Sequence, residues 1–330
     1  GARPTSGETR EPKRWSCPAR GTCSGETLRV VAFAGGTGSA KLIRGLQRLD
    51  VDLTVVANVG DNAWMYGAYV CPDVDIACYT VAGVANASRG WGVEGDTFRF
   101  LEAAAKLGVE TWFRLGDRDL ATCLARTDML RRGLTLTEAT DRIRKALGAE
   151  PRVLPACDEP VRTTVSTPKG ELGLQEFWVR DLGRPRVNRV YYRGASRARP
   201  TRQVADAVRR ADRVVVCPAN PITSIGPMLA VPGFRNLVSS SRRVVAVSPM
   251  VGSAPFSGPA GKLMKAAGER PDSLGVARLY AGVIGALLVS DADAGLKPRI
   301  DALGVECRLG ETKMAGPADE ARLAREVLEA

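Results

Sequence analysis

Residues 35–41, which read Gly-Gly-Thr-Gly-Ser-Ala-Lys, are the first part of the chain with a chemical signature. They join an apolar run to a helix-like segment, where small residues let backbone N–H groups reach an anion at the positive end of a helix dipole. The spacing is neither that of a Walker loop nor that of a dinucleotide fingerprint. A tight structural turn is the alternative interpretation. The candidate phosphate-binding residues are Gly36, Thr37, Gly38 and Lys41.

Three aspartates, Asp61, Asp73 and Asp75, follow the next apolar run. The chain has no histidine, which excludes imidazole catalysis and His-ligated zinc and leaves acid–base chemistry to carboxylates. Oxygen ligands of this kind suit a hard cation such as Mg²⁺ bridging phosphates. The same spacing also permits a structural interpretation, in which Asp73 caps a helix and Asp61 closes a turn. All three are candidate catalytic and metal-binding residues.

Two further segments combine turn residues with polar side chains. Residues 218–227 follow an apolar run and are dense in turn residues, hydroxyls and amides, which favours a ligand-contacting loop that includes Asn220 and Ser224. Residues 115–120 place an arginine between two carboxylates, directly after Arg114. A surface ion-pair network would have the same composition, so this second segment has both a functional and a structural interpretation.

These polar segments follow short, fully apolar runs that alternate with helical segments. Such runs are typical of strands in a parallel sheet that is covered on both faces and binds ligands at the carboxyl ends of its strands. We therefore expect an α/β fold with a doubly wound, mainly parallel, Rossmann-like sheet. The predicted strands are residues 28–34, 53–59, 213–217 and 243–247.

The middle of the chain departs from this alternation. Its periodicity predicts three helices and then a hairpin with a further strand. We expect a flexible extension at residues 1–26, a nucleotide-binding core at residues 27–96 and 200–330, and an inserted helix-and-hairpin subdomain at residues 97–199. The predicted helices are residues 97–107, 119–130 and 137–147, and the predicted strands are residues 161–167, 171–179 and 187–192.

Composition narrows the function classes. The 330 residues carry a net charge of +11, which attracts anions, but only 5% are aromatic and no aromatic cluster alternates with basic residues as single-stranded nucleic-acid binders require. Apolar runs fall far short of the roughly 18 residues that a membrane helix needs. None of the eight cysteines forms a Cys-x-x-Cys pair, which indicates free thiols in a reducing compartment. We expect a cytoplasmic protein without nucleic-acid or membrane partners.

Taken in order, the motifs closely resemble those of the 2-phospho-L-lactate transferase family, which makes the deazaflavin coenzyme F-420. The resemblance covers about residues 28–330. It implies Mg²⁺-dependent transfer of a phospholactyl-type group from a guanosine diphosphate-linked donor to the deazaflavin precursor Fo, with release of GMP. The motifs are Gly-Gly-Thr-Gly at residues 35–38, Asp-Asn-Ala-Trp at 61–64, Cys-Pro-Asp-Val-Asp at 71–75, Trp-Gly at 91–92, Leu-Gly-Asp-Arg-Asp-Leu-Ala-Thr at 115–122, Gln-Glu-Phe-Trp at 175–178, Asn-Pro-Ile-Thr-Ser-Ile-Gly-Pro at 220–227 and Ser-Gly-Pro-Ala-Gly-Lys at 257–262.

The resemblance also implies roles for individual residues. Asp75 and Arg114 would contact Fo. Where many members have a second acid and a histidine, this chain has Asn62 and Tyr66, so the general base would be one of the three aspartates. Mg²⁺ would be held by Asp61, Asp73 and Asp75. The guanosine donor would be faced by Gly36, Thr37, Gly38, Asn220 and Ser224.

Two other functions are open from the sequence. A nucleotide- or sugar-nucleotide-sensing regulator of the same fold would keep the glycine-rich turn but would have no chemical need for the aspartates. A basic nucleic-acid-binding protein would show a salt-dependent affinity for oligonucleotides. The donor acid is also open, because lactate, enolpyruvate and glycerate differ by a methyl, a methylene or a hydroxyl group. We expect a homodimer.

Overall fold

The computed structural model describes residues 27–241, 243–256 and 258–330, and the extension predicted at residues 1–26 lies outside them. Its centre is a seven-stranded sheet in the order β14-β13-β10-β9-β1-β2-β5, in which every neighbouring pair is parallel. The doubly wound α/β fold predicted from the sequence is confirmed. The strands are β1 (Leu28–Ala34), β2 (Val51–Ala57), β5 (Arg152–Pro155), β9 (Arg213–Val216), β10 (Val244–Val247), β13 (Ala286–Ser290) and β14 (Glu306–Gly310).

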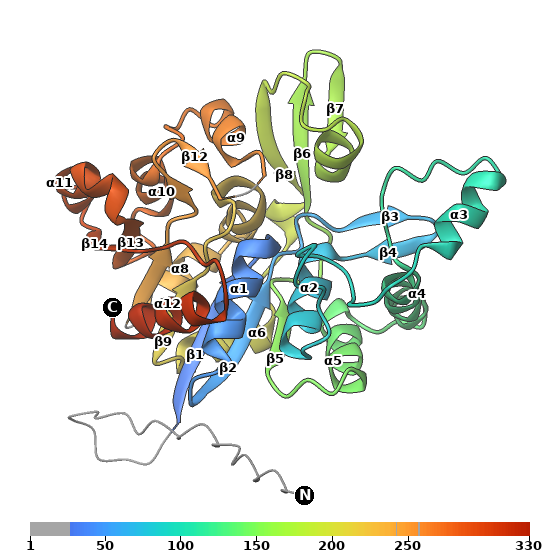
Figure 1. The fold of residues 1–330 in the computed structure, drawn as a ribbon, viewed down its shortest axis with the longest axis horizontal. Helices are drawn as coiled ribbons and strands as arrows, with labels where there is room; N and C mark the ends of the chain where they lie inside the picture. Colours follow the sequence, from blue (N-terminus) through green and yellow to red (C-terminus); the bar gives the residue numbers. More distant parts are fainter. Residues whose placement is uncertain (1–26, 242, 257) are drawn as a thin grey trace, which may run out of the picture.

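Helices cover both faces of this sheet, which explains why the strands are apolar on both sides (Figure 1). On one face α1 (Gly36–Leu46) contacts α2 (Pro72–Val81) and α12 (Pro317–Glu329). On the other face α6 (Arg202–Arg210) contacts α8 (Phe234–Ser239). The chain passes from β1 to β2 through α1 and later from β5 back across β1 to β9 through α6, so the two crossovers run in opposite directions along the sheet. The carboxyl ends of β1, β2 and β9 therefore meet at one edge.

The helical part of the middle segment forms close to the predicted positions. Its helices are α3 (Arg99–Lys106), α4 (Asp117–Arg131) and α5 (Leu136–Ala146), the last begun by a capping box between Thr135 and Glu138. A short hairpin of β3 (Ala63–Met65) and β4 (Ala68–Val70), which the sequence pattern did not indicate, lies beside α4. Figure 1 shows this hairpin and α3 projecting from one side of the molecule.

Two details of the middle segment differ from the sequence-based expectation. Residues 152–155, assigned there to the insert, form strand β5 at the edge of the central sheet, where they pair with β2. Only four residues long and closed by Pro155, this strand lacks a recognisable apolar run. The hairpin of β6 (Arg162–Thr167) and β7 (Gly170–Gly173) is present and β8 (Arg189–Arg193) completes its sheet, but the predicted second strand ends at Gly173 and is followed by a π-helical turn, η1 (Glu176–Arg180).

The remaining elements lie mainly in the second half of the chain. They are η2 (Ala195–Arg197), η3 (Pro221–Ile225), α7 (Gly226–Leu229), β11 (Met250–Val251), β12 (Ala254–Pro255), α9 (Ala260–Ala266), α10 (Ser273–Tyr280), η4 (Asp291–Leu296) and α11 (Lys297–Asp301).

Among the described residues, no helix is both long and apolar enough to cross a membrane. The six described cysteines are free and buried.

Candidate active site

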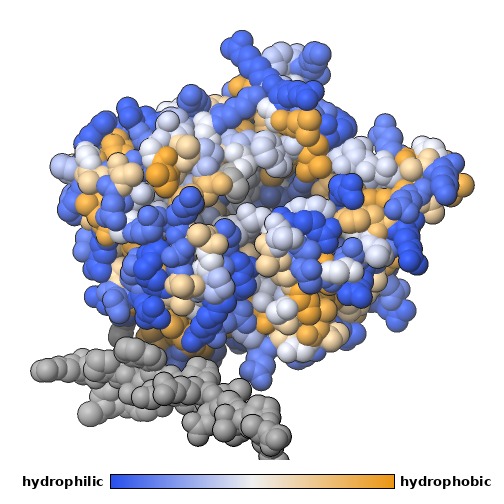
Figure 2. Space-filling model, in the orientation of Figure 1, coloured by the Kyte–Doolittle hydropathy of each residue, from blue (hydrophilic) through white to orange (hydrophobic). Residues whose placement is uncertain are grey.

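A cavity of about 340 Å³ lies at the carboxyl ends of β1, β2 and β9. We call it the glycine-turn cavity. Figure 2 shows the surface hollowed in this region, between α1 and the small sheet of β6, β7 and β8. Seven residues that the sequence analysis selected line this one cavity, although they come from four separate segments. They are Gly36, Thr37, Gly38, Asp61, Asp73, Asn220 and Ser224.

The glycine-rich turn has a conformation that other residues could not adopt without strain or collision. Gly36 has a φ of +69°, in the left-handed region that favours glycine. A Cβ on Gly35 would lie 2.4 Å from the Cβ of Ser224, and one on Gly38 would lie 2.2 Å from the carbonyl oxygen of Pro218. Since α1 begins at Gly36, the turn presents the N-terminus of this helix to the cavity. This arrangement suits a phosphate group.

Asp73 ties the turn to the rest of the cavity. It lies in the first turn of α2, which begins with Pro72 and gains from negative charge at its N-terminus. Its Oδ1 accepts a hydrogen bond of 2.7 Å from the backbone N–H of Gly36, and its Oδ2 accepts one of 2.8 Å from Nδ2 of Asn58. Burial nevertheless raises the pKa of the Asp73 carboxyl, because these two bonds replace only part of its lost hydration.

Asn58 is a residue of the site that the sequence analysis did not select. Its side chain is fully buried at the end of β2, where Nδ2 also donates to the carbonyl oxygen of Thr223 and Oδ1 accepts from the N–H of Gly60. It thereby connects the carboxyl end of β2 to the segment after β9 through Thr223, and to the first turn of α2 through Asp73. Its sequence signal is an amide residue placed directly after a fully apolar strand.

Asp61 shares the cavity with Asp73, and its carboxyl pKa is the more strongly shifted of the two. Burial, followed by the negative charge of Asp73, raises the pKa of the Asp61 carboxyl well above its usual value. Its Oδ1 is buried and has no hydrogen-bond partner among the described residues. The buried Asp73 and the half-buried Asp61, whose Oδ1 is unused, form a site that gains stability from a cation or from a proton.

A second cavity, of about 590 Å³, opens beside the first. Trp64, Tyr69 and Trp112 contribute aromatic surface to it, and we call it the aromatic cavity. Three residues, Asp61, Leu174 and Gln175, line both cavities. Asp61 therefore lies where a molecule bound in one cavity would meet a molecule bound in the other. The sequence analysis did not anticipate this cavity, since its wall depends on the β3–β4 hairpin.

The side chains of Lys41 and Arg114 contact residues outside these two cavities. The amine of Lys41 donates a hydrogen bond of 2.8 Å to the carbonyl oxygen of Met314, and Lys41 lines neither cavity. Arg114 is exposed, and its guanidinium lies 4.3 Å from the centre of the Phe98 ring. Arg89 lies over the same ring at 5.3 Å. Both arginines thus form cation–π contacts on the surface loop that precedes α3.

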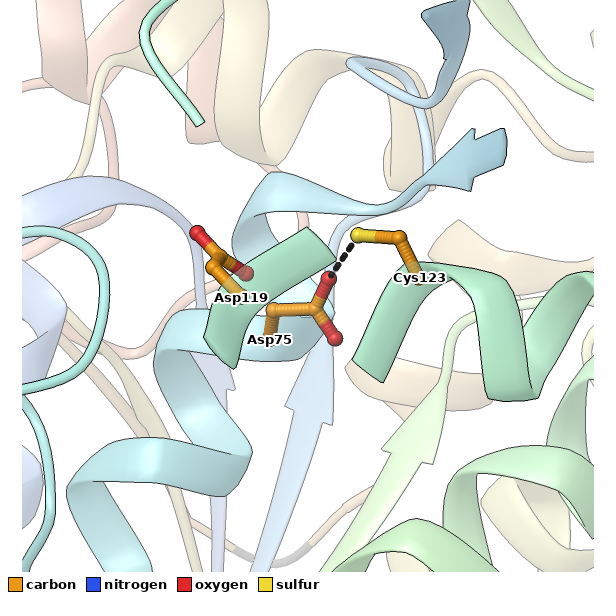
Figure 3. Close-up of side chains that lie close together, drawn as sticks. All are labelled: Asp75, Asp119 and Cys123. Carbon is orange, nitrogen blue, oxygen red and sulfur yellow. Dashed lines mark hydrogen bonds between the residues drawn. The ribbon is translucent and has the colours of Figure 1, made fainter. Parts of the chain in front are cut away.

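Asp75 points away from Asp61 and Asp73 into a separate cluster with Asp119 and Cys123, shown in Figure 3. Possible ligand atoms of these three residues lie within 4.8 Å of one another. The cluster is nevertheless closed by Arg126, which is fully buried and forms an ion pair with both carboxylate oxygens of Asp75. A guanidinium therefore already occupies the position in which a cation would bind Asp75.

Comparison with known proteins places the chain in a family. The profile described as "2-phospho-L-lactate transferase CofD" matches residues 30–302. The chain belongs to the 2-phospho-L-lactate transferase family. The prediction made from the motifs is confirmed, as is the prediction that the chain is an enzyme, a transferase.

Named members of the 2-phospho-L-lactate transferase family match along nearly their whole length. The 2-phospho-L-lactate transferase of Methanopyrus kandleri is 42% identical over 305 residues, which cover 91% of this chain and 97% of that protein. The one from Methanosarcina mazei is 37% identical and covered completely, with 91% of this chain matched. A phosphoenolpyruvate transferase from Streptomyces griseus is 38% identical, with 92% of this chain and 98% of that protein covered.

A solved structure supports the fold. A UPF0052 family member from Bacillus halodurans superposes with a TM-score of 0.63 over 92% of this chain and all of that chain, at 17% sequence identity. This likeness shows that the fold, a central sheet with covering helices, is shared with that protein. It carries no information on the chemistry.

Proposed function

We propose that the protein transfers a phospholactyl-type group from a guanosine diphosphate-linked donor to the deazaflavin Fo and releases GMP, in coenzyme F-420 biosynthesis. The observation that carries the proposal is the position of Asp61 between two cavities of different character. A two-substrate transfer needs two binding sites that meet at the reacting atoms. The family assignment supports a transfer reaction, and the two adjoining cavities support Asp61 as the point where the substrates meet.

The glycine-turn cavity is the proposed donor site. Its backbone N–H groups at the start of α1 suit the diphosphate, because they combine hydrogen bonding with the positive end of the helix dipole. The amide of Asn220 caps the following turn through bonds from the N–H groups of Ile222 and Thr223, which fixes its position beside Ser224. We assign Asn220 and Ser224 to the guanosine half of the donor.

The aromatic cavity is the proposed acceptor site. Fo is a flat ring system with a hydroxyl-bearing chain, and the tryptophan and tyrosine walls offer stacking surface for such a ring. The hydroxyl chain would then extend past Leu174 and Gln175 toward Asp61. Arg114, which the resemblance assigns to Fo, stays a predicted contact outside the residues that line this cavity.

Asp61 and Asp73 are the residues that would hold Mg²⁺. The fit rests on their mutual repulsion and on the unpartnered Oδ1 of Asp61, which a hard cation would relieve. When bound, Mg²⁺ would neutralise charge on the diphosphate. Asp75 is not included in this pair, because both of its oxygens are held by Arg126.

In the proposed reaction, a hydroxyl oxygen of Fo attacks the phosphorus that bears the acid, and the bond from this phosphorus to the oxygen bridging it to GMP breaks. The hydroxyl proton passes to the carboxylate of Asp61, and GMP leaves with the bonding electrons. Asp61 is assigned as the general base because it lines both cavities, where the attacking hydroxyl would arrive. Most of the acceleration would come from alignment and charge neutralisation.

The test is to incubate the purified protein with Fo, Mg²⁺ and each of the lactyl, enolpyruvyl and phosphoglycerate donors, and to identify the product by mass. We expect Fo to gain the mass of one phospho-acid group with at least one donor, and GMP to appear in equal amount. Asp61→Asn, which keeps the size of the side chain and removes the base, should give neither product. If Fo gains no mass with any donor, the regulator hypothesis replaces this one.

A further inference from the structure

Arg126 is a fully buried arginine, and its contacts bridge two parts of the site. Its two terminal nitrogens bind the carboxylate of Asp75 on α2, and Nη1 also donates to the carbonyl oxygen of Tyr69 on β4 at 3.2 Å. Nε has no hydrogen-bond partner among the described residues. The guanidinium thus joins α4 to α2 and to the β3–β4 hairpin at one point.

We propose that Arg126 is a positioning residue that fixes the place of the aromatic cavity relative to the glycine-turn cavity. The inference rests on the proposed function, since it assigns one substrate to each cavity. A buried ion pair is a weak source of stability, because the lost hydration of both charges offsets their attraction. Its value here is geometric: a bidentate guanidinium fixes both the distance and the orientation of the groups that it binds.

The first connection runs to the donor side. Asp75 lies two residues after Asp73 in the first turn of α2, so holding the Asp75 carboxylate fixes the rotation and depth of this turn. Asp73 in turn accepts the hydrogen bond from Gly36 that holds the glycine-rich turn. A shift of Asp75 would therefore move the proposed metal-binding carboxylate and the N-terminus of α1 together.

The second connection runs to the acceptor side. Both backbone groups of Tyr69 are bound by side chains of α4: Arg126 holds its carbonyl oxygen, and Oγ1 of Thr127 accepts from its N–H at 2.7 Å. The Tyr69 side chain lines the aromatic cavity and lies 5.2 Å from the Trp64 ring, measured between ring centres. Arg126 is therefore one of two side chains of α4 that hold this wall of the cavity.

Two variants test the proposal. Arg126→Lys keeps the charge but loses the planar fork that binds both oxygens of Asp75, and the double variant Asp75→Asn with Arg126→Met removes both charges and keeps the volume. We expect both to fold and both to turn over about 100-fold more slowly, the loss that a misplacement of about 1 Å produces. The KM for each substrate should stay within about 3-fold, because each cavity keeps its own lining.

Arg144→Lys is the matched control, since Arg144 is a buried arginine on α5 that binds the carbonyl oxygens of Ala149 and Glu150 and lines neither cavity. It should keep the wild-type rate. If the double variant folds and regains the wild-type rate, or if neither variant folds, the role of Arg126 is structural and the inference is wrong. Inactivity of the wild type with every donor would instead overturn the proposed function, so the two failures are distinct.

Discussion

The carboxylate of Asp73 accepts a hydrogen bond of 2.7 Å from the backbone N–H of Gly36, and this contact joins the first turns of α1 and α2 across 37 residues of sequence. The bond occupies Oδ1, while Oδ2 is bound by Asn58. Asp73 therefore has two functions that a substitution can separate. It shapes the glycine-rich turn, and it contributes negative charge to the proposed metal site.

Asp73→Asn should separate these functions. An asparagine oxygen can still accept from Gly36, although its amide replaces the oxygen that accepts from Asn58. The charge is lost, so Mg²⁺ binding should weaken while the Gly36 contact is kept. We expect turnover to fall at least about 100-fold, as for loss of a major electrostatic contributor. Asp128→Asn, a change at an exposed carboxylate on α4, is the matched control. Turnover measured over a Mg²⁺ titration checks this, and a wild-type rate at low Mg²⁺ would remove Asp73 from the metal site.

Asp75→Ala should act mainly on stability. The change leaves the buried Arg126 guanidinium without its counter-charge, which costs about 3–5 kcal/mol of unfolding free energy. Turnover would also fall, since the first turn of α2 loses its anchor. Urea denaturation of the variant beside Asp128→Ala, which removes an exposed acid on α4, measures the difference. Equal stability of the two variants would contradict the assigned contact.

Asp119 should make stability depend on pH near neutrality. Burial and then the negative charge of Asp75 raise its pKa to about 7. Because the folded protein binds this proton more tightly than the unfolded chain, the contribution is complete below the usual carboxyl pKa and is lost as pH rises through about 7.

Asp119→Asn should flatten this part of the stability profile. An asparagine oxygen can still accept the hydrogen bond of 2.8 Å from the Tyr79 hydroxyl, so the local packing is kept. Urea midpoints measured from pH 5 to pH 8 at constant ionic strength test the expectation. A profile of unchanged slope in the variant would mean that another group titrates in this range.

Arg114→Ala should distinguish a substrate contact from a surface contact. By resemblance Arg114 binds Fo, so its loss should raise the Kd for Fo by roughly one to two orders of magnitude, the range of a charged hydrogen bond. Arg89→Ala is the matched control, because Arg89 lies over the same Phe98 ring and the resemblance assigns it no substrate. Fo fluorescence titrations measure both. Equal small effects would leave Arg114 as a partner of Phe98 alone.

The parts of the fold predicted from sequence are those with a local cause. Strands β1, β2, β9 and β10 follow from continuous apolar runs, and the carboxyl ends of β1, β2 and β9 necessarily gather the polar residues after them at one edge. This explains why Gly36, Asp61, Asp73, Asn220 and Ser224 line one cavity as expected from separate motifs.

The parts that were not predicted depend on contacts between distant residues. The pairing of Asp75 with Arg126 joins positions 51 residues apart, and no periodicity marks either residue as a partner. Lys41 lies on α1 one turn beyond the glycines, and its long side chain reaches Met314 in the segment before α12, which only the tertiary fold brings near. The aromatic cavity was missed for the same reason.

The reactivity of the buried cysteines can report local unfolding of this protein. Burial raises the pKa of Cys217, which directly follows β9 of the central sheet, to about 12, and it also raises the pKa of Cys123 on α4. A thiol that is both covered and protonated does not react with alkylating reagents until its surroundings separate. Labelling at Cys123 therefore records the loosening of the insert, and labelling at Cys217 records the loss of the core. The order in which the two thiols react would show whether the insert or the core opens first.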